Sequence, residues 1–335
     1  MTALLCEPEE RLGGEILLTL LYVLLALLAA ALIVSGLIGW KVSSMILRPK
    51  NWPYDTIVDE EEKRGHFTRE WFEQNVRLEE FTIRSPFGYN LHAAVWPHED
   101  ASVFADGKPR VAVLVHGYTY CLLGGIKYAS IFHSLGFDCV LYDHRNHGLS
   151  DRALTTMGLN EARDLSAVCD WARERFGADA ILGTHGESMG AATVLLHAPQ
   201  YPRLSFVVED CGYSDLNAEL RFALTHRFHL PWFPVLAFAS LFSRLRGGVF
   251  FGSVVPKRGL QNCGALPMLF IHGDADELVP FSMLAENFDA KPGIKAKRAF
   301  PGAPHAGCYH ADPAAYAECL TTFLMENGIL APKAQ

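Results

Sequence analysis

The chain has 335 residues, of which 50% are apolar and 20% are charged, and its formal net charge is −8. This composition is that of a packed globular protein and excludes a largely disordered chain. A nucleic-acid-binding function is also excluded, because neutralising phosphates requires a basic face and the sequence shows none.

The first forty residues differ from the rest of the chain. Residues 1–15 form an N-terminal tail, and residues 16–40 contain no charged side chain. Twenty-five helical residues rise about 37 Å, enough to cross a hydrocarbon core of about 30 Å. A cleaved signal peptide would begin with basic residues, whereas Glu7, Glu9 and Glu10 precede this run. A buried helix is another alternative, although a helix apolar on all sides at this length is more typical of lipid. We predict one transmembrane helix over residues 16–40 that holds the protein at a membrane.

The charges and cysteines around this helix indicate its orientation. Lys41, Arg48 and Lys50 follow it closely, against Arg11 alone before it. The positive-inside rule therefore places the larger C-terminal part in the cytoplasm. Seven of the eight cysteines lie beyond the helix, scattered and without close-spaced pairs. Reduced thiols fit this pattern better than a disulfide framework does.

The remaining chain reads as a linker followed by one α/β domain. Residues 41–75 are mixed and charged, and we interpret them as a juxtamembrane linker and a helix. From residue 76 to about 330, short apolar runs alternate with helical stretches, which predicts a mostly parallel sheet covered by helices on both faces. The expected strands are 76–83, 91–96, 110–115, 137–142, 180–183, 205–209 and 267–271. The expected helices are 122–135, 160–176, 189–199, 281–290 and 312–327.

One interval interrupts this alternation. More than fifty residues, rich in Phe and Trp, separate the strand that ends near 209 from the one that starts near 267. A segment of this length inside a compact domain is usually functional. We predict a helical cap over about residues 214–262 with a surface suited to apolar substrates. The alternative is an ordinary pair of packing helices.

Residues 186–190 read Gly-Glu-Ser-Met-Gly and match the pattern Gly-x-Ser-x-Gly. An apolar run precedes the motif and a helical stretch follows it. This is the setting of a nucleophile elbow, in which a sharp strand–turn–helix connection exposes a serine hydroxyl. The pattern predicts Ser188 as a nucleophile.

A serine nucleophile needs a histidine base and a carboxylate that orients the histidine. Asp274, Asp276 and Glu277 follow the predicted strand 267–271, and His305 lies in a loop of small residues before the last helix. The order Ser…Asp…His is that of this architecture. A loop aspartate is more often a turn former, so position alone leaves all three acids open. For the oxyanion, the pattern predicts the backbone N–H groups of Met189 and Tyr118 as donors.

Five motifs together resemble the bacterial α/β-hydrolases of the esterase, lipase and serine-aminopeptidase-like group, most closely the membrane-anchored members. They are HGYT at 116–119, DHRNHGLS at 143–150, GESMG at 186–190, HGDADELVP at 272–280 and PGAPHA at 301–306. The resemblance covers about residues 75–330 and implies an α/β-hydrolase fold. It also implies Asp276 as the acid, and a structural turn at 143–150. Asn146 and Pro304 stand where glycine is more usual in that group.

The sequence therefore predicts a serine hydrolase that cleaves ester-type bonds in an apolar acyl substrate. A serine peptidase acting on short peptides is the alternative, and a non-catalytic binding protein is a further one. His144 and His147 suggest a metal site, but neither a His-Glu-x-x-His motif nor cysteine pairs support it. The glycine-rich stretch 183–190 lacks the Gly-Lys-Ser/Thr of a phosphate loop. We expect no metal and no organic cofactor.

Overall fold

The computed structural model describes residues 7–98 and 104–330. Their centre is an eight-stranded sheet in the order β1-β2-β4-β3-β5-β6-β7-β8. Strand β2 runs antiparallel to β1 and β4, and the pairs from β4 through β8 are parallel. The strands are β1 Glu79–Arg84, β2 Asn90–Trp96, β3 Arg110–Val115, β4 Asp138–Tyr142, β5 Ile181–Glu187, β6 Phe206–Asp210, β7 Met268–Gly273 and β8 Lys295–Phe300.

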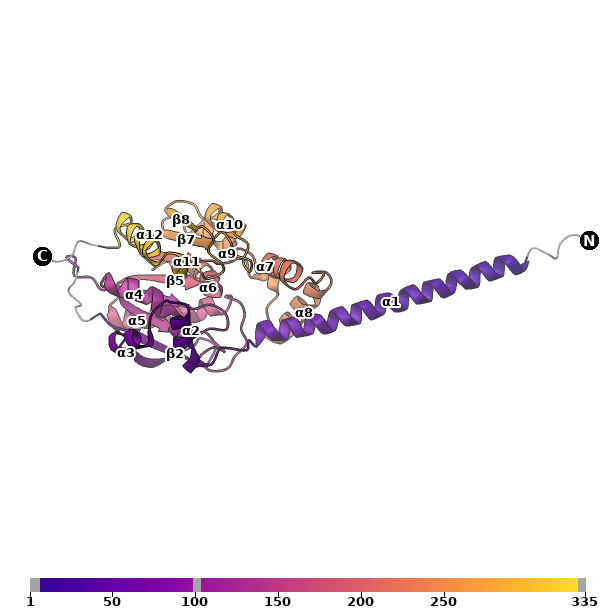
Figure 1. Cartoon of the computed structure of the whole chain (residues 1–335), viewed down its shortest axis with the longest axis horizontal. Helices are drawn as coiled ribbons and strands as arrows, with labels where there is room; N and C mark the ends of the chain where they lie inside the picture. Colours follow the sequence, from indigo (N-terminus) through magenta and orange to yellow (C-terminus); the bar gives the residue numbers. More distant parts are fainter. Residues whose placement is uncertain (1–6, 99–103, 331–335) are drawn as a thin grey trace, which may run out of the picture.

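Helices cover both faces of this sheet (Figure 1). They are α2 Ile57–Lys63, α3 Arg69–Asn75, α4 Ile126–Ser134, α5 Glu161–Phe176, α6 Met189–His197, α10 Ser282–Ala290, α11 Cys308–Ala311 and α12 Pro313–Glu326. The predicted α/β fold with a mostly parallel sheet is confirmed. Strand β8 was not predicted, because its sequence KAKRAF is charged and largely exposed at the edge of the sheet.

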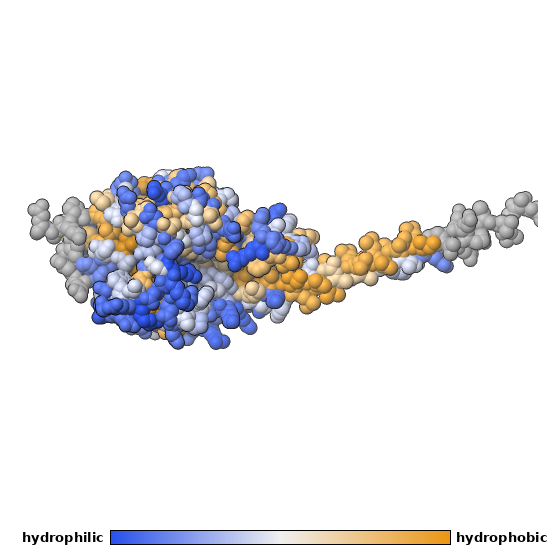
Figure 2. Space-filling view, in the orientation of Figure 1, coloured by the Kyte–Doolittle hydropathy of each residue, from blue (hydrophilic) through white to orange (hydrophobic). Residues whose placement is uncertain are grey.

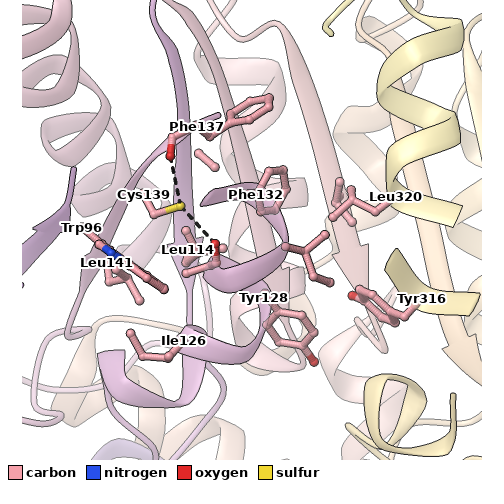
Figure 3. Packing of buried hydrophobic residues seen from close by; sticks show 14 of the residues in the cluster. Trp96, Leu114, Ile126, Tyr128, Phe132, Phe137, Cys139, Leu141, Tyr316 and Leu320 are labelled. Carbon is pink, nitrogen blue, oxygen red and sulfur yellow. Dashed lines mark hydrogen bonds between the residues drawn. The ribbon is translucent and has the colours of Figure 1, made fainter. Parts of the chain in front are cut away.

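The alternation of side chains along β3 separates two cores. Ala112 and Leu114 point to one face, where they join a cluster with α4 and α12, whereas Val111 and Val113 point to the other face and pack with α5 and α6. Figure 3 shows part of the first cluster, in which Phe132 lies between the sheet and the C-terminal helix. Both cores fix the sheet, so the ends of its strands provide rigid positions for loops.

Helix α1 spans Glu7–Leu47 and extends far from the α/β body (Figure 1). Its segment Gly14–Leu47 is long and apolar enough to cross a membrane. Residues 1–6 of the predicted tail lie outside the described residues. The helix does not end at residue 40: residues 41–47, expected to belong to a linker, continue it. Pro49 explains the end, because proline disfavours helical geometry in the residue before it.

The interval between β6 and β7 consists mostly of helices. They are α7 Leu216–Phe222, a π-helical turn at Ala223–Arg227, α8 Val235–Gly247, a 3₁₀ turn at Phe251–Ser253, α9 Pro256–Gly259 and a 3₁₀ turn at Leu260–Asn262. We call this segment, Leu216–Asn262, the cap. It shares a third apolar cluster with Ile46 of α1 and Met189 of α6. The cap therefore packs between α1 and the start of the helix that follows Ser188.

Candidate active site

Ser188 lies at the sharp turn between β5 and α6, with a φ of 57° and a ψ of −117°. This conformation is strained for a residue with a side chain. The backbone N–H of Ser188 donates to the carbonyl of Asp210 over 2.8 Å, which helps to hold the turn. A Cβ at Gly186 would lie 2.3 Å from the carbonyl oxygen of Gly190, and a Cβ at Gly190 would lie 2.0 Å from that of Val115. The two glycines are therefore required by the close approach of the backbone.

The structure brings Ser188, His305 and Asp276 into one chain of hydrogen bonds. Ser188 Oγ lies 2.8 Å from His305 Nε2, and His305 Nδ1 lies 2.7 Å from Asp276 Oδ2. The three residues follow β5, β8 and β7, which are parallel, so their loops meet at the carboxyl edge of the sheet. Asp276 is buried, whereas Ser188 and His305 are partly exposed. The hydroxyl can therefore be reached by a substrate.

The surroundings of Asp276 keep it ionised. Its Oδ1 accepts from the backbone N–H groups of Leu278 and Val279, over 2.8 and 2.9 Å. Its Oδ2 lies 3.2 Å from His272 Nε2, in addition to the contact with His305. Burial by itself would raise the pKa of Asp276, but the hydrogen bonds from His272, His305 and the Val279 N–H outweigh burial and hold the pKa below its ordinary value. A carboxylate in this state can orient the imidazole and stabilise its cation.

The other two candidate acids lie elsewhere. Asp274 accepts from the backbone N–H of Gly302 over 2.6 Å and so ties the loop after β7 to the loop after β8. Glu277 is exposed. Of the three acids, Asp276 is the one hydrogen-bonded to His305.

The backbone N–H groups of Tyr118 and Met189 both belong to the loops beside Ser188. Within residues 7–98 and 104–330, neither N–H donates to a protein acceptor. His116 orients the Tyr118 peptide: its Nε2 accepts from the N–H of His144 (2.9 Å), so its Nδ1 carries the proton and donates to the Gly117 carbonyl (2.7 Å). Burial lowers the pKa of His116 to about 4, which keeps the ring neutral. The Gly117 carbonyl and the Tyr118 N–H belong to one trans peptide and point in opposite directions. The hydrogen bond to the carbonyl therefore also fixes the direction of the N–H.

A buried ionic network under Ser188 was not predicted from the sequence. Lys127 Nζ lies 3.0 Å from Glu187 Oε2 and 3.7 Å from Glu61 Oε2. Tyr128 donates to Glu187 over 2.6 Å, and His66 contacts Glu61 at 2.8 Å. Burial would raise the pKa of Glu61, but Lys127 and His66 lower it to about 2. Glu187 occupies a variable position of Gly-x-Ser-x-Gly and Glu61 lies in the supposed linker, so no sequence signal linked them.

A cavity of about 660 Å³ opens above Ser188. Its wall is almost entirely apolar and comes from α1, the cap and the loops at the carboxyl edge of the sheet. The lining residues are Ile38, Lys41, Val42, Met45, Ile46, Tyr118, Met157, Ser188, Met189, Tyr213, Glu219, Leu220, Ala223, Leu224, Phe228, Leu230, Leu278 and Val279. The volume falls in the usual range of ligand pockets.

Some side chains around Ser188 are of the types that bind metal ions. Among the described residues, Cys211, Asp276 and His305 form a group whose potential ligand atoms lie within 4.8 Å of one another. Burial, with nearby acidic groups, raises the pKa of the Cys211 thiol well above its ordinary value. Asp276 and His305 are already hydrogen-bonded to each other. The Asp276 carboxylate and the His305 ring are therefore engaged in the hydrogen-bonded series that ends at Ser188 Oγ.

Comparison with known proteins agrees with this architecture. The protein YqkD of Bacillus subtilis (strain 168) is 32% identical over 303 residues, which cover 89% of this chain and 96% of YqkD. The sequence pattern of the α/β-hydrolase fold matches residues 113–208. The chain belongs to the α/β-hydrolase fold family. Among solved structures, the Pyrococcus furiosus esterase Pf2001 is similar with a TM-score of 0.64 and 17% identity, over 84% of this chain and 98% of the esterase. A puromycin-hydrolysing peptidase of Mycobacterium tuberculosis gives a TM-score of 0.61 and 23% identity, over 77% of this chain and 40% of the peptidase.

In this α/β-hydrolase, the turn at 143–150 contacts the loop that carries Tyr118, because the His144 N–H donates to His116 Nε2. Asp143 accepts from the N–H groups of Leu122 and Leu149 and contacts His92 Nδ1 at 2.8 Å. Asn146, which stands where glycine is more usual, has a φ of 62°, a left-handed conformation that asparagine tolerates better than most residues.

Pro304, the other departure, begins a tight turn, because its carbonyl accepts from the Gly307 N–H over 3.0 Å. This turn leaves His305 directed at Ser188, as the 2.8 Å contact between Ser188 Oγ and His305 Nε2 shows.

Proposed function

We propose that the chain is a membrane-anchored serine hydrolase that cleaves carboxylic ester bonds of apolar acyl substrates through an acyl-enzyme on Ser188. The observation that carries the proposal is the hydrogen-bonded series Ser188–His305–Asp276 at the floor of an apolar cavity. The hydrolase fold supports the general activity, and the esterase likeness is consistent with the bond type.

In the first half-reaction, Ser188 Oγ attacks the carbonyl carbon of the ester while its proton passes to His305 Nε2. Asp276 keeps the imidazole in position and stabilises the cation that forms. The N–H groups of Tyr118 and Met189 donate to the developing oxyanion. Collapse of the tetrahedral intermediate breaks the bond to the alcohol, which leaves with the proton from His305 Nε2.

In the second half-reaction, a water molecule takes the place of the alcohol. It attacks the acyl carbonyl, its proton passes to His305 Nε2, and the same two N–H groups stabilise the oxyanion. Ser188 then leaves with that proton and the carboxylic acid is released. None of these steps requires a metal or an organic cofactor.

The cavity favours an acyl ester over a peptide. Its polar side chains are few, and a peptide would bring several backbone donors and acceptors that would lose their hydrogen bonds to water there. An acyl chain brings none. The likeness to the puromycin-hydrolysing peptidase makes peptide hydrolysis the second candidate.

The test is hydrolysis of p-nitrophenyl esters by the full chain in lipid nanodiscs. Wild type is compared with Ser188→Ala, and with Ser282→Ala, which changes an exposed serine at the start of α10. We expect Ser188→Ala to lose about 10⁴-fold or more in kcat and Ser282→Ala to resemble wild type. Near-native hydrolysis by Ser188→Ala would overturn the assignment, and cleavage of short peptides but not esters would favour the second candidate.

A further inference from the structure

The C-terminal part of α1 forms a wall of the cavity above Ser188. Ile38, Val42, Met45 and Ile46 line it from α1, and the cap supplies the facing wall. This part of α1 was expected to be lipid-embedded helix and linker, and neither role would require contact with a substrate. Without α1, the cavity would lose this wall and its apolar surface would face solvent.

Close packing fixes α1 against α8. A Cβ at Gly39 would lie 2.7 Å from Cβ of Phe238, so a glycine is needed where the two helices meet. Arg246 stacks over the ring of Trp40, at 4.2 Å from the ring centroid, and donates to Ser44 Oγ over 2.7 Å. α1 is therefore a fixed part of the cap region.

The end of α1 is also tied to the loop that carries the Tyr118 N–H. The hydroxyl of Tyr118 donates to the carbonyl of Met45. A few residues later, the Trp52 N–H donates to the carbonyl of Thr119 over 3.0 Å. The position of α1 therefore bears on both the cavity wall and the proposed oxyanion donors.

The cavity opens beside α1. Three of its lining residues are exposed and so mark the mouth: Lys41, Met45 and Phe228, of which Met45 is 55% and Phe228 is 54% exposed. Lys41 directly follows the uncharged run of α1. The mouth therefore lies where the predicted transmembrane segment would leave the hydrocarbon core.

The surface around this mouth is apolar and continuous with α1. Figure 2 shows apolar area running from α1 onto the cap. Large apolar side chains that are exposed on the cap are Phe228, Trp232, Phe233, Leu241, Leu245 and Phe250. Exposed Arg227 and Arg244 border this surface and suit lipid phosphates.

The size of the cavity suits an acyl chain. A methylene group takes up about as much volume as a water molecule, on the order of 30 Å³, so a 16-carbon chain needs about 480 Å³. A cavity of about 660 Å³ is therefore large enough for one such chain.

We propose that the cavity is the acyl site for a lipid ester, which enters from the bilayer between α1 and the cap. This inference rests on the proposed function for the type of bond that is cleaved. The binding of the acyl chain in the cavity does not depend on that function. The alcohol side of the ester stays at the mouth, at the level of the lipid headgroups, while the acyl chain lies between α1 and the cap.

The first test measures chain-length preference in nanodiscs. Gly39→Leu forces α1 away from α8, whereas Gly36→Leu makes the same change three residues earlier, where a Cβ meets nothing within 4 Å. We expect Gly39→Leu to lower the ratio of kcat/KM for dodecanoyl over acetyl esters at least tenfold, since each buried methylene contributes about fourfold. Gly36→Leu should keep the wild-type ratio. Val42→Phe, which fills the cavity without separating the helices, should lower the ratio too. Unchanged ratios in both Gly39→Leu and Val42→Phe would overturn the proposal.

The second test does not depend on catalysis. An ester whose acyl chain ends in a photoreactive diazirine is incorporated into nanodiscs with the Ser188→Ala protein. Adducts on residues 38–46 and on the cap would support the acyl site, even if wild type hydrolysed no ester and the proposed function failed. Adducts found only on the lipid-facing residues 16–37 would overturn the site.

Discussion

The loops that carry Ser188, Asp276 and His305 and the α1–cap cavity are neighbours that are held in different ways. Ser188, Asp276 and His305 sit on loops at the ends of three parallel strands, which two buried cores fix in place. The cavity is bounded on one side by a helix that enters from outside the α/β body and contacts it mainly through the cap. Damage to the first region should abolish the chemistry, whereas damage to the second should change which acyl chains are accepted.

The largest effect is expected at the carboxylate that orients His305. Asp276→Asn should lower kcat about 10³- to 10⁴-fold with the fold retained, because the imidazole would lose its anionic partner and its correct tautomer. Ester hydrolysis measures this effect. Asp274→Asn is the matched control: it alters the loop contact to Gly302 and should leave kcat within a few-fold of wild type. Equal losses in the two variants would contradict the role of Asp276.

The buried ionic network beneath Ser188 should contribute strongly to the free energy of unfolding. Lys127→Met leaves Glu61 and Glu187 buried without their shared cation, and we expect a loss of about 3–5 kcal/mol in the free energy of unfolding. Chemical denaturation in detergent measures it. Lys63→Met breaks an ion pair whose lysine is exposed and should change stability little. A similar result for both lysines would show that the network does not stabilise the fold.

Glu219, in the wall of the cavity, should make the stability of the folded chain depend on pH. It lines the cavity, is 7% exposed, and its Oε2 has no hydrogen-bond partner among the described residues. Burial, with a smaller contribution from Asp276, raises its pKa from the ordinary 4.5 to about 8. Between these values the folded chain keeps a proton that the unfolded chain has lost, so stability falls as pH rises through this window.

Glu219→Gln should therefore be more stable than wild type, by a margin that grows from pH 5 to pH 8 and then levels. Each unit of pKa shift corresponds to about 1.4 kcal/mol. Thermal unfolding across this range measures the margin, with Glu318→Gln on the exposed face of α12 as control. A margin independent of pH would mean that Glu219 titrates normally.

The smallest effect is expected where the two regions touch. Tyr118→Phe removes the hydroxyl that donates to the Met45 carbonyl but keeps the backbone N–H. We expect a loss of about 1 kcal/mol in the free energy of unfolding. The dodecanoyl-to-acetyl ratio should fall less than in Gly39→Leu. A larger fall would show that this hydrogen bond, and not the packing of Gly39 against α8, mainly holds α1 in place.

The meeting of Ser188, Asp276 and His305 could be predicted from the sequence, because the signal for each residue is local. The motif around Ser188 follows a buried strand directly, and the order of Ser188, Asp276 and His305 follows from the chain. The strands were recognisable from their apolar runs, except for charged β8 at the edge.

The cavity could not be predicted, because its contacts join distant parts of the chain. Arg246 meets Ser44 across 202 positions and Tyr118 meets Met45 across 73. Nothing in residues 41–47 distinguishes a linker from a cavity wall until the cap packs against them. Glu61, 126 positions before Glu187, was missed for the same reason.

The most direct test of the central claim is labelling of the full chain with an alkyl fluorophosphonate, followed by mass spectrometry of the peptides. We predict one covalent adduct, on Ser188, that forms rapidly in wild type and at least a hundredfold more slowly in His305→Ala. A folded wild-type protein with no adduct, or with an adduct on a different residue, would contradict the account.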